Sequence, residues 1–243
     1  MRRFTLLTAA VLMYVTMSMA QTTYSSIQAM PGITSCSSCA GAGGSGSTAT
    51  YSMKQFQSSP SLDGKATEFY LGGSTPYSDA MWTKRVSSSS SYHHFVFDAY
   101  YYVKTPNAVQ GLEFNITDYA SLRGYTFGFT CDVKSSGTWK ISVPKSATST
   151  MSQMYWLSTG ISCPAPQAYT WNHVQFEGLR TSDNKVEYIS LTINGNKHYL
   201  NKTVYARSCP SGWAGATTHF QLNGDSNQDH YSLWADEWNV TLW

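Results

Sequence analysis

Charged residues are scarce in this chain of 243 residues, since they make up 12% of the sequence, about half of the usual quarter. This scarcity excludes a disordered polyelectrolyte and a coiled coil, which both depend on dense charge. Stretches rich in Ala, Glu, Lys and Leu at a helical period are also missing. A helical bundle is therefore disfavoured.

A cluster of basic residues is missing as well. The sequence holds 16 Lys and Arg against 14 Asp and Glu, and Arg2 and Arg3 belong to a predicted N-terminal signal. Without that signal, 14 basic residues balance 14 acidic ones, so the net charge is zero. Phosphate backbones and anionic membrane surfaces are bound by several clustered cations. The sequence therefore predicts no nucleic-acid partner and no insertion into a membrane.

Long apolar runs are confined to the N-terminus. A basic start, residues 1–3, precedes an apolar stretch, residues 4–19, and Ser18-Met19-Ala20 is an acceptable cleavage site. The stretch is shorter than the roughly 20 residues of a membrane-spanning helix. We therefore predict that residues 1–20 are a secretory signal and that Gln21 begins the mature chain. The predicted location is extracellular, with the periplasm or the cell surface as alternatives.

Aromatic residues are abundant at 14%, and they lie among many Ser, Thr and Gly residues. This composition favours short strands joined by uncharged turns. Alternating patterns predict strands over Ala66–Leu71, Phe95–Lys104, Gln110–Ile116, Gly124–Val133, Thr138–Val143, Met154–Leu157, Trp171–Gly178, Val186–Ile193, His198–Lys202, Thr217–Asn223 and Tyr231–Leu242. Asn194-Gly195 is typical of a type I′ hairpin turn. The predicted fold is all-β, an antiparallel two-sheet sandwich over residues 51–243, after a Cys/Gly/Ser-rich lead-in over residues 21–50.

All five cysteines follow the predicted signal, and an oxidising compartment permits disulfides. Cys131 and Cys163 both lie among predicted strands, and we expect them to pair. Cys36 and Cys39 are close enough in a Gly/Ser-rich stretch for a local bridge. Cys209 then has no partner.

The candidate binding surface comes from the polar sides of alternating strands. Where Phe95 and Phe97 face the core, Asp98 and Tyr100 face the other way. The same reasoning, applied to the predicted strands over 110–116 and 217–223, gives one polar, aromatic face that suits a carbohydrate chain. Its expected members are Asp98, Tyr100, Tyr102, Glu113, Asn115, Gln221 and Asn223, with Trp82, Tyr92, Trp139, Tyr155 and Trp156 at the rim.

Several segments carry a family resemblance. Trp171-Asn-His-Val174, followed by Tyr188-Ile-Ser-Leu-Thr-Ile-Asn-Gly195, resembles a paired motif of laminin-G-like domains, with Ile193 where that motif has Val. Leu233–Leu242 resembles the last strand of such folds, and Cys36–Gly44 and Leu112–Asn115 are similar to segments of secreted sequences. The chain as a whole resembles the concanavalin A-like lectin/glucanase superfamily. The resemblance implies a jelly-roll sandwich whose concave sheet binds carbohydrate, although a fold does not settle a function.

Three functions follow from this interpretation. The first is a secreted, monomeric, lectin-like protein that binds a polysaccharide. The second is a glycoside hydrolase or polysaccharide lyase, in which Glu113 works with Asp98 or Glu177. The Glu-x-Asp-x-x-Glu signature of glucanases is absent from the sequence. The third is a structural envelope or matrix protein without a small ligand.

No cofactor or metal is expected. Residues 225–229, Asp-Ser-Asn-Gln-Asp, have the alternating oxygens of a calcium loop's start, but they lack its Gly and distal Glu. We interpret the segment as a solvated turn, with calcium as the alternative.

Overall fold

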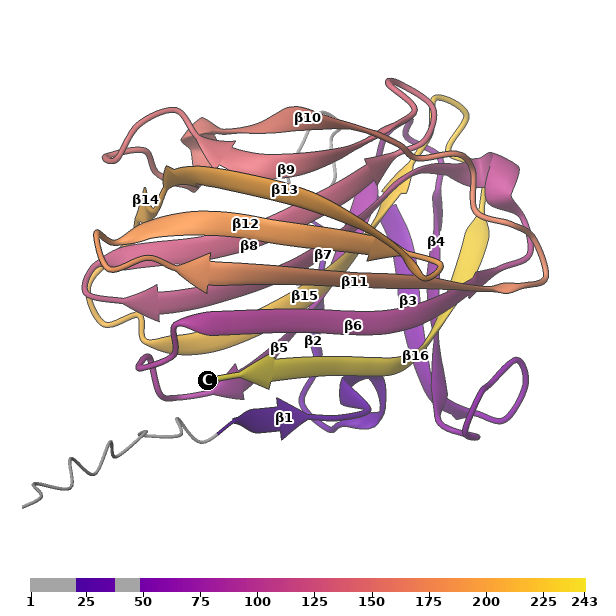
Figure 1. Cartoon of the computed structure of the whole chain (residues 1–243). Coiled ribbons are helices and arrows are strands. Elements are labelled where there is room, and N and C mark those ends of the chain that lie inside the picture. The colour runs from indigo at the N-terminus through magenta and orange to yellow at the C-terminus, as the bar shows by residue number, and fades with distance from the viewer. Residues whose placement is uncertain (1–20, 38–48) are drawn as a thin grey trace, which may run out of the picture.

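The protein is described here by a computed structural model that covers residues 21–37 and 49–243. The described residues form two antiparallel sheets packed face to face, so the predicted all-β sandwich is confirmed (Figure 1). The predicted signal, residues 1–20, lies outside these ranges. The helical residues form short 3-10 turns, η1 (Ile27–Ala29), η3 (Pro106–Ala108) and η4 (Met151–Gln153). None of the helices in the described ranges is long and apolar enough to cross a membrane.

Each sheet has eight strands in the described ranges. Sheet A has the order β13-β12-β11-β6-β16-β4-β3, with β1 beside β16, and sheet B has the order β10-β9-β8-β7-β15-β5-β2, with β14 beside β8. The strands of sheet A are β1 (Thr22–Tyr24), β3 (Ala49–Gln57), β4 (Ala66–Gly73), β6 (His94–Val103), β11 (Trp171–Arg180), β12 (Lys185–Ile193), β13 (Asn196–Tyr205) and β16 (Tyr231–Leu242). Those of sheet B are β2 (Thr34–Cys36), β5 (Asp79–Ser87), β7 (Val109–Ala120), β8 (Arg123–Asp132), β9 (Thr138–Pro144), β10 (Met154–Ser162), β14 (Arg207–Ser208) and β15 (Gly215–Gly224).

Aromatic rings from the inner faces of the two sheets make the core. Phe97 of β6 stacks on Phe176 of β11, with ring centroids 4.8 Å apart, and both are buried. Across the sandwich, the ring centroid of Phe97 lies 5.7 Å from that of Phe114 of β7, and the ring centroid of Phe176 lies 4.6 Å from that of Phe129 of β8. Because alternate residues of a strand share one face, these inward rings fix which side chains point outward.

The described part of the predicted lead-in is joined to both sheets. Residues 21–37 contribute a strand to each sheet, since β1 pairs with β16 and β2 pairs with β5. Between them, Ile27 is fully buried in the core, and the buried Gln28 donates from Nε2 to Asp236 Oδ1 at 3.0 Å. An apolar anchor and a satisfied buried amide thus hold this segment in the sandwich. Residues 38–48 lie outside the described ranges.

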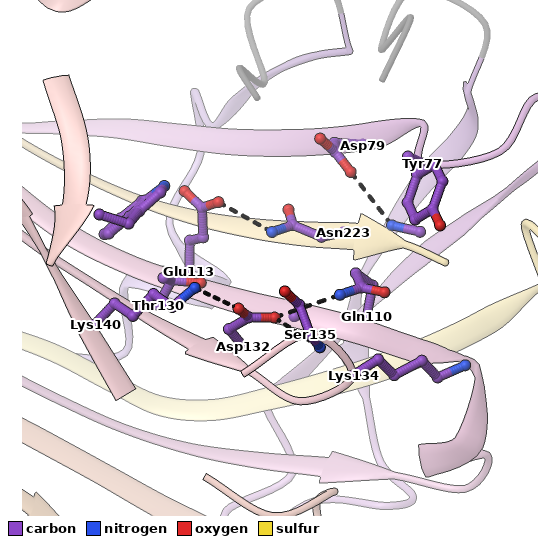
Figure 2. Close-up of a pocket in the computed structure, with 13 residues that line it drawn as sticks. Tyr77, Asp79, Gln110, Glu113, Thr130, Asp132, Lys134, Ser135, Lys140 and Asn223 are labelled. Atoms are coloured by element: carbon purple, nitrogen blue, oxygen red, sulfur yellow. Dashed lines mark hydrogen bonds and ion pairs between the residues drawn. The ribbon is translucent and has the colours of Figure 1, made fainter. Parts of the chain in front are cut away.

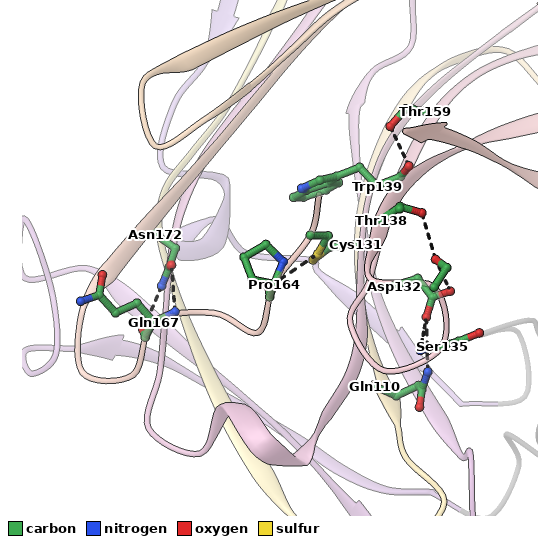
Figure 3. Close-up of a disulfide and its surroundings, with 12 residues drawn as sticks. Gln110, Cys131, Asp132, Ser135, Thr138, Trp139, Thr159, Pro164, Gln167 and Asn172 are labelled. Atoms are coloured by element: carbon green, nitrogen blue, oxygen red, sulfur yellow. Dashed lines mark hydrogen bonds between the residues drawn. A yellow bond between two sulfur atoms is a disulfide. The ribbon is translucent and has the colours of Figure 1, made fainter. Parts of the chain in front are cut away.

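The predicted Cys131–Cys163 disulfide is present (Figure 3). It links β8 to the segment that leaves β10 of sheet B for β11 of sheet A, and Cys163 N also donates to Gly137 O at 2.8 Å. A bridge across 32 positions restricts the unfolded chain and stabilises the fold by about 2–4 kcal/mol. Cys209 is buried and free. Cys39 lies outside the described residues, so its pairing with Cys36 stays a prediction.

Gly178 lets the two sheets approach each other at a β-bulge. The register of β11 against β12 shifts between Glu177 and Gly178. A Cβ on Gly178 would lie 2.2 Å from Cδ1 of Phe127, a buried ring of sheet B. Only a residue without a side chain fits this contact.

We therefore expect Gly178→Ala to lower the free energy of unfolding by about 1–3 kcal/mol through overpacking. Urea unfolding of the variant and of the wild type measures this difference. The same substitution in a Phe127→Leu background should cost less, because the smaller side chain leaves room. An equal cost in both backgrounds would contradict a clash between Gly178 and Phe127 as the cause.

Candidate functional site

A groove crosses the outer face of sheet B. Its larger part is a cleft of about 1460 Å³, floored by β5, β15, β7 and β8 and walled by residues 150–156 and 207–214. A second hollow of about 460 Å³ adjoins it. Glu113 and Trp156 line both parts, so they stand where the two meet. We call the whole the sheet B groove.

Strand register brings the groove residues together. Met81, Gln221, Glu113, Thr130 and Lys140 lie side by side in one row across β5, β15, β7, β8 and β9. Since neighbours in a row share a face, all five side chains belong to the outer face of sheet B.

The next row of outward-facing residues on that face also lies on the floor of the groove. It runs through Thr83, His219, Asn115 and Gly128. A Cβ on Gly128 would lie 2.9 Å from Nδ2 of Asn115, so the absence of a side chain there makes room for the amide. Asn115 is 4% exposed and lies on the groove floor.

Glu113 is a buried carboxyl held by two amides. Its Oε1 accepts a hydrogen bond from Nε2 of Gln221 at 3.1 Å. It accepts a second from Nδ2 of Asn223 at 3.0 Å (Figure 2). Burial leaves the residue 8% exposed and raises its pKa to about 7, because the charged form loses its hydration. The hydrogen bond from Asn223 opposes this shift without cancelling it. Glu113 therefore exchanges its proton near neutral pH.

Asp79, at the start of β5, is a second buried acid in the groove. Figure 2 shows Asn223 between Asp79 and Glu113. The Asp79 carboxyl accepts a hydrogen bond from Gly224 N at 3.3 Å. Burial, and next the charge of Glu113, raise the pKa of Asp79 to about 8. Two neighbouring acids thus disfavour each other's ionisation. Asp79 was not among the residues predicted from the sequence, because no clear alternation marks the strand that begins there.

His219 lies further along the floor. Burial, and next the charge of Arg207, lower the pKa of this imidazole to about 4. The ring is therefore neutral at neutral pH, when it can donate from one nitrogen and accept at the other.

The predicted single binding face is wrong in one respect. Glu113, Asn115, Gln221 and Asn223 do lie together, on strands β7 and β15 of sheet B. Asp98, Tyr100 and Tyr102 lie on β6, and Glu177 lies on β11, all in sheet A. Their side chains face away from the core that separates the two sheets. Alternation shows which side of its own strand a residue occupies, but it does not assign the strand to a sheet.

The sheet A residues have partners of their own. Asp98 Oδ1 lies 2.7 Å from Nε2 of His173, and Asp98 Oδ2 accepts a hydrogen bond from Nε2 of Gln175 at 2.7 Å. Tyr100 stacks on His173, with ring centroids 4.4 Å apart. Glu177 lies 3.4 Å from His94 and 3.5 Å from Lys197. The predicted acid pairs of Glu113 with Asp98 or with Glu177 are therefore wrong.

The five aromatic residues predicted for the rim lie in two different places. Tyr155 and Trp156 of β10 line the sheet B groove. Trp82 and Trp139 are buried in the core, and Tyr92 packs against it. Large rings near a predicted face are as often packing residues as contact residues.

The segment 225–229 forms a closed turn. Asp225 is fully buried, and its Oδ1 accepts hydrogen bonds from the backbone N–H groups of Asn227 and Asp229 at 3.0 and 3.1 Å. Its other oxygen contacts Nζ of Lys134. Within residues 21–37 and 49–243, no three His, Cys, Asp or Glu side chains are grouped to hold a metal ion. The expectation that the protein needs no cofactor stays a prediction.

Comparisons with known proteins give similarities to solved structures only. No family model matches the sequence, and no curated protein matches it. The chain is similar to Cip1, a cellulose-induced protein, at a TM-score of 0.48 and 10% identity over 86% of this chain and 90% of that one. It is also similar to alginate lyase vAL-1 from a Chlorella virus, at a TM-score of 0.47 and 12% identity over 75% of this chain and 87% of that one. A third similar structure is a carbohydrate esterase from bacteriophage phi24B, at a TM-score of 0.45 and 13% identity over 81% of this chain and 89% of that one.

The raised pKa of Glu113 predicts a pH-dependent stability. The ordinary pKa of the carboxyl is 4.5, and its pKa in the folded chain is about 7. Between these two pH values, the folded chain keeps a proton that the unfolded chain has released. The stability that Glu113 contributes is therefore fully present below about pH 4.5 and is lost as the pH rises through 7.

Glu113→Gln keeps an acceptor but does not titrate. The stability of the wild type relative to this variant should thus fall by about 3 kcal/mol from pH 4 to pH 8, as measured by urea unfolding. A difference that does not change with pH would show that Glu113 titrates normally.

Proposed function

We propose that this protein binds a polysaccharide chain along the sheet B groove. The observation that carries the proposal is the continuity of the groove, since its two parts meet at Glu113 and Trp156 and together cross the outer face of the sheet. A groove that is open along a sheet suits a chain-like ligand better than a compact one.

The chemistry of the groove supports a sugar ligand. Amide and hydroxyl groups line the floor, and they match the paired donors and acceptors of sugar hydroxyls. Rings of Trp156, Tyr119 and Trp213 line the same space, and the C–H faces of sugars pack on such rings. The buried floor is held in place by its own hydrogen bonds, so little ordering is needed on binding.

We also propose that the protein acts as a monomer outside the cytoplasm. The Cys131–Cys163 disulfide is compatible with an oxidising compartment.

The binding proposal predicts a contrast between the two sheets. Trp156→Ala should weaken retention on the cognate glycan by about tenfold, because it removes a stacking surface from the groove. Tyr100→Ala and Tyr102→Ala, on the outer face of sheet A, are matched controls and should leave retention unchanged. Affinity electrophoresis on a panel of polysaccharides measures all three variants. Loss of retention in the tyrosine variants alone would move the site to sheet A, and no retention of the wild type would favour a structural role.

A specific observation favours a second function, cleavage of the bound chain. Glu113 exchanges its proton near neutral pH and stands where both parts of the groove meet. Such a carboxyl can act as a general acid or base. Asp79, which lines the smaller hollow, is the acid beside it. A glycan hydrolase or lyase would use Glu113 as the proton-transfer group.

If the protein is an enzyme, Glu113→Gln should lower product release from the cognate glycan by at least about 100-fold while retention persists. Asp98→Asn, on sheet A, is the control and should keep full activity. Reducing-end and unsaturated-product assays distinguish hydrolysis from elimination. Full activity of the Glu113 variant would assign the chemistry to another group.

A further inference from the structure

Arg207 is a buried cation that has no anionic partner among the residues that the structure describes. It is the one lysine or arginine that is buried among the described residues, at 4% exposure. Its guanidinium donates only to neutral groups, each at 3.3 Å, namely Thr126 Oγ1, Ser208 O and Tyr119 OH. Among residues 21–37 and 49–243, no carboxylate lies within 4.0 Å of it.

Other cations that are less buried than Arg207 are paired with acids. Lys140 lies 2.5 Å from Asp132, Lys134 contacts Asp225, and Arg180 lies 3.7 Å from Asp118. A charge that is removed from water is costly unless an opposite charge compensates it. The partners of Arg207 among the described residues are neutral, so they satisfy some of its N–H groups without compensating its charge.

The fold holds the guanidinium in a fixed position. Strand β14 pairs with β8, and Arg207 lies opposite Gly124. A Cβ on Gly124 would lie 2.8 Å from Cζ of Arg207, so the missing side chain lets the guanidinium lie close to β8. Tyr119 packs against it, with the ring centroid 5.4 Å from Cζ. Trp213, which is 52% exposed, stands edge-on to Tyr119 at 5.0 Å.

This fixed guanidinium lines the larger part of the sheet B groove, together with Tyr119 and Trp213. Arg85 lines the same part and is exposed. It donates from Nη2 to Ala214 O at 2.8 Å, and no carboxylate of the described residues pairs with it. Two guanidinium groups thus face one segment of the groove.

The other titratable groups of the groove do not cancel this charge. Burial raises the pKa of Glu113 to about 7 and that of Asp79 to about 8, so both hold protons for much of the time at neutral pH. His219 is neutral there, because burial lowers its pKa. Asp132 is paired with Lys140. The larger cleft is therefore positive at neutral pH.

We propose that Arg207, assisted by Arg85, binds an anionic group of the glycan, so that the ligand is a polysaccharide bearing carboxylate or sulfate groups. The inference rests on the proposed function and names its ligand class. A guanidinium presents parallel N–H donors that match the two oxygens of a carboxylate or sulfate group. Tyr119 and Trp213 would hold the sugar ring that carries this group.

The test uses polysaccharides that share a backbone and differ in charge. The purified protein is run at pH 7 through gels that contain polygalacturonate or its full methyl ester, alginate or its propylene glycol ester, and dextran sulfate or dextran. We expect retention by acidic members only, and the carboxylate and sulfate members show which anion is bound. Arg207→Gln and Arg85→Gln should each weaken retention about tenfold or more. Lys202→Gln, on the exposed strand β13 of sheet A, removes the same charge and should have no effect.

The outcomes separate the two proposals. Retention by neutral members would overturn the anionic inference and leave the proposed function standing, whereas no retention by any member would overturn both. Unchanged retention of acidic members in both arginine variants would also overturn the inference. Arg85 is exposed, so Arg85→Gln keeps the test valid if Arg207→Gln does not fold. Arg207→Lys shows whether a positive charge alone is enough for retention of the acidic members.

Discussion

Burial of strand β7 on both faces is the constraint on which the rest of this site depends. Its inner side chains, Leu112, Phe114 and Ile116, pack in the core, and its outer ones, Glu113, Asn115 and Thr117, are less than a tenth exposed as well. Buried polar groups must find partners within the protein. Each outer side chain therefore belongs to a network, which extends from Glu113 to the amides of β15 and from Thr117 to Asn115 and Thr126.

The same constraint explains why the floor of the groove is rigid while its walls carry the exposed rings. Gln221 is 2% exposed and donates both to Glu113 and to Asn223, so rotation of Gln221 would break both hydrogen bonds at once. Trp213 and Tyr155, on the walls, are about half exposed. A ligand therefore meets fixed polar groups below it and adaptable apolar surface at its sides.

Sequence patterns predicted most strands after residue 90 and the polar side of each, because alternation at a period of two is a local property, but they did not predict β3 or β5. They could not predict which strands become neighbours. Asp98 and Glu113 both oppose aromatic core residues in their own strands, yet β6 lies in sheet A and β7 lies in sheet B. Asp79 and Arg207 were missed for a related reason, since each lies at an element end where no alternation marks it. The contact of β14 with β8 joins residues more than eighty positions apart, and only the fold shows it.

Burial acts in opposite ways on the acids and on the arginine of the groove, and this difference sets its charge. A carboxyl responds to the loss of water by keeping its proton, so Glu113 and Asp79 become less negative near neutral pH. A guanidinium cannot respond in this way, because its pKa is too high for it to lose a proton in a protein. Desolvation therefore removes negative charge from the floor and leaves the positive charge of Arg207 in place. The groove thus owes its positive charge near neutral pH to burial, and a rise in pH that ionises both acids would reduce that charge.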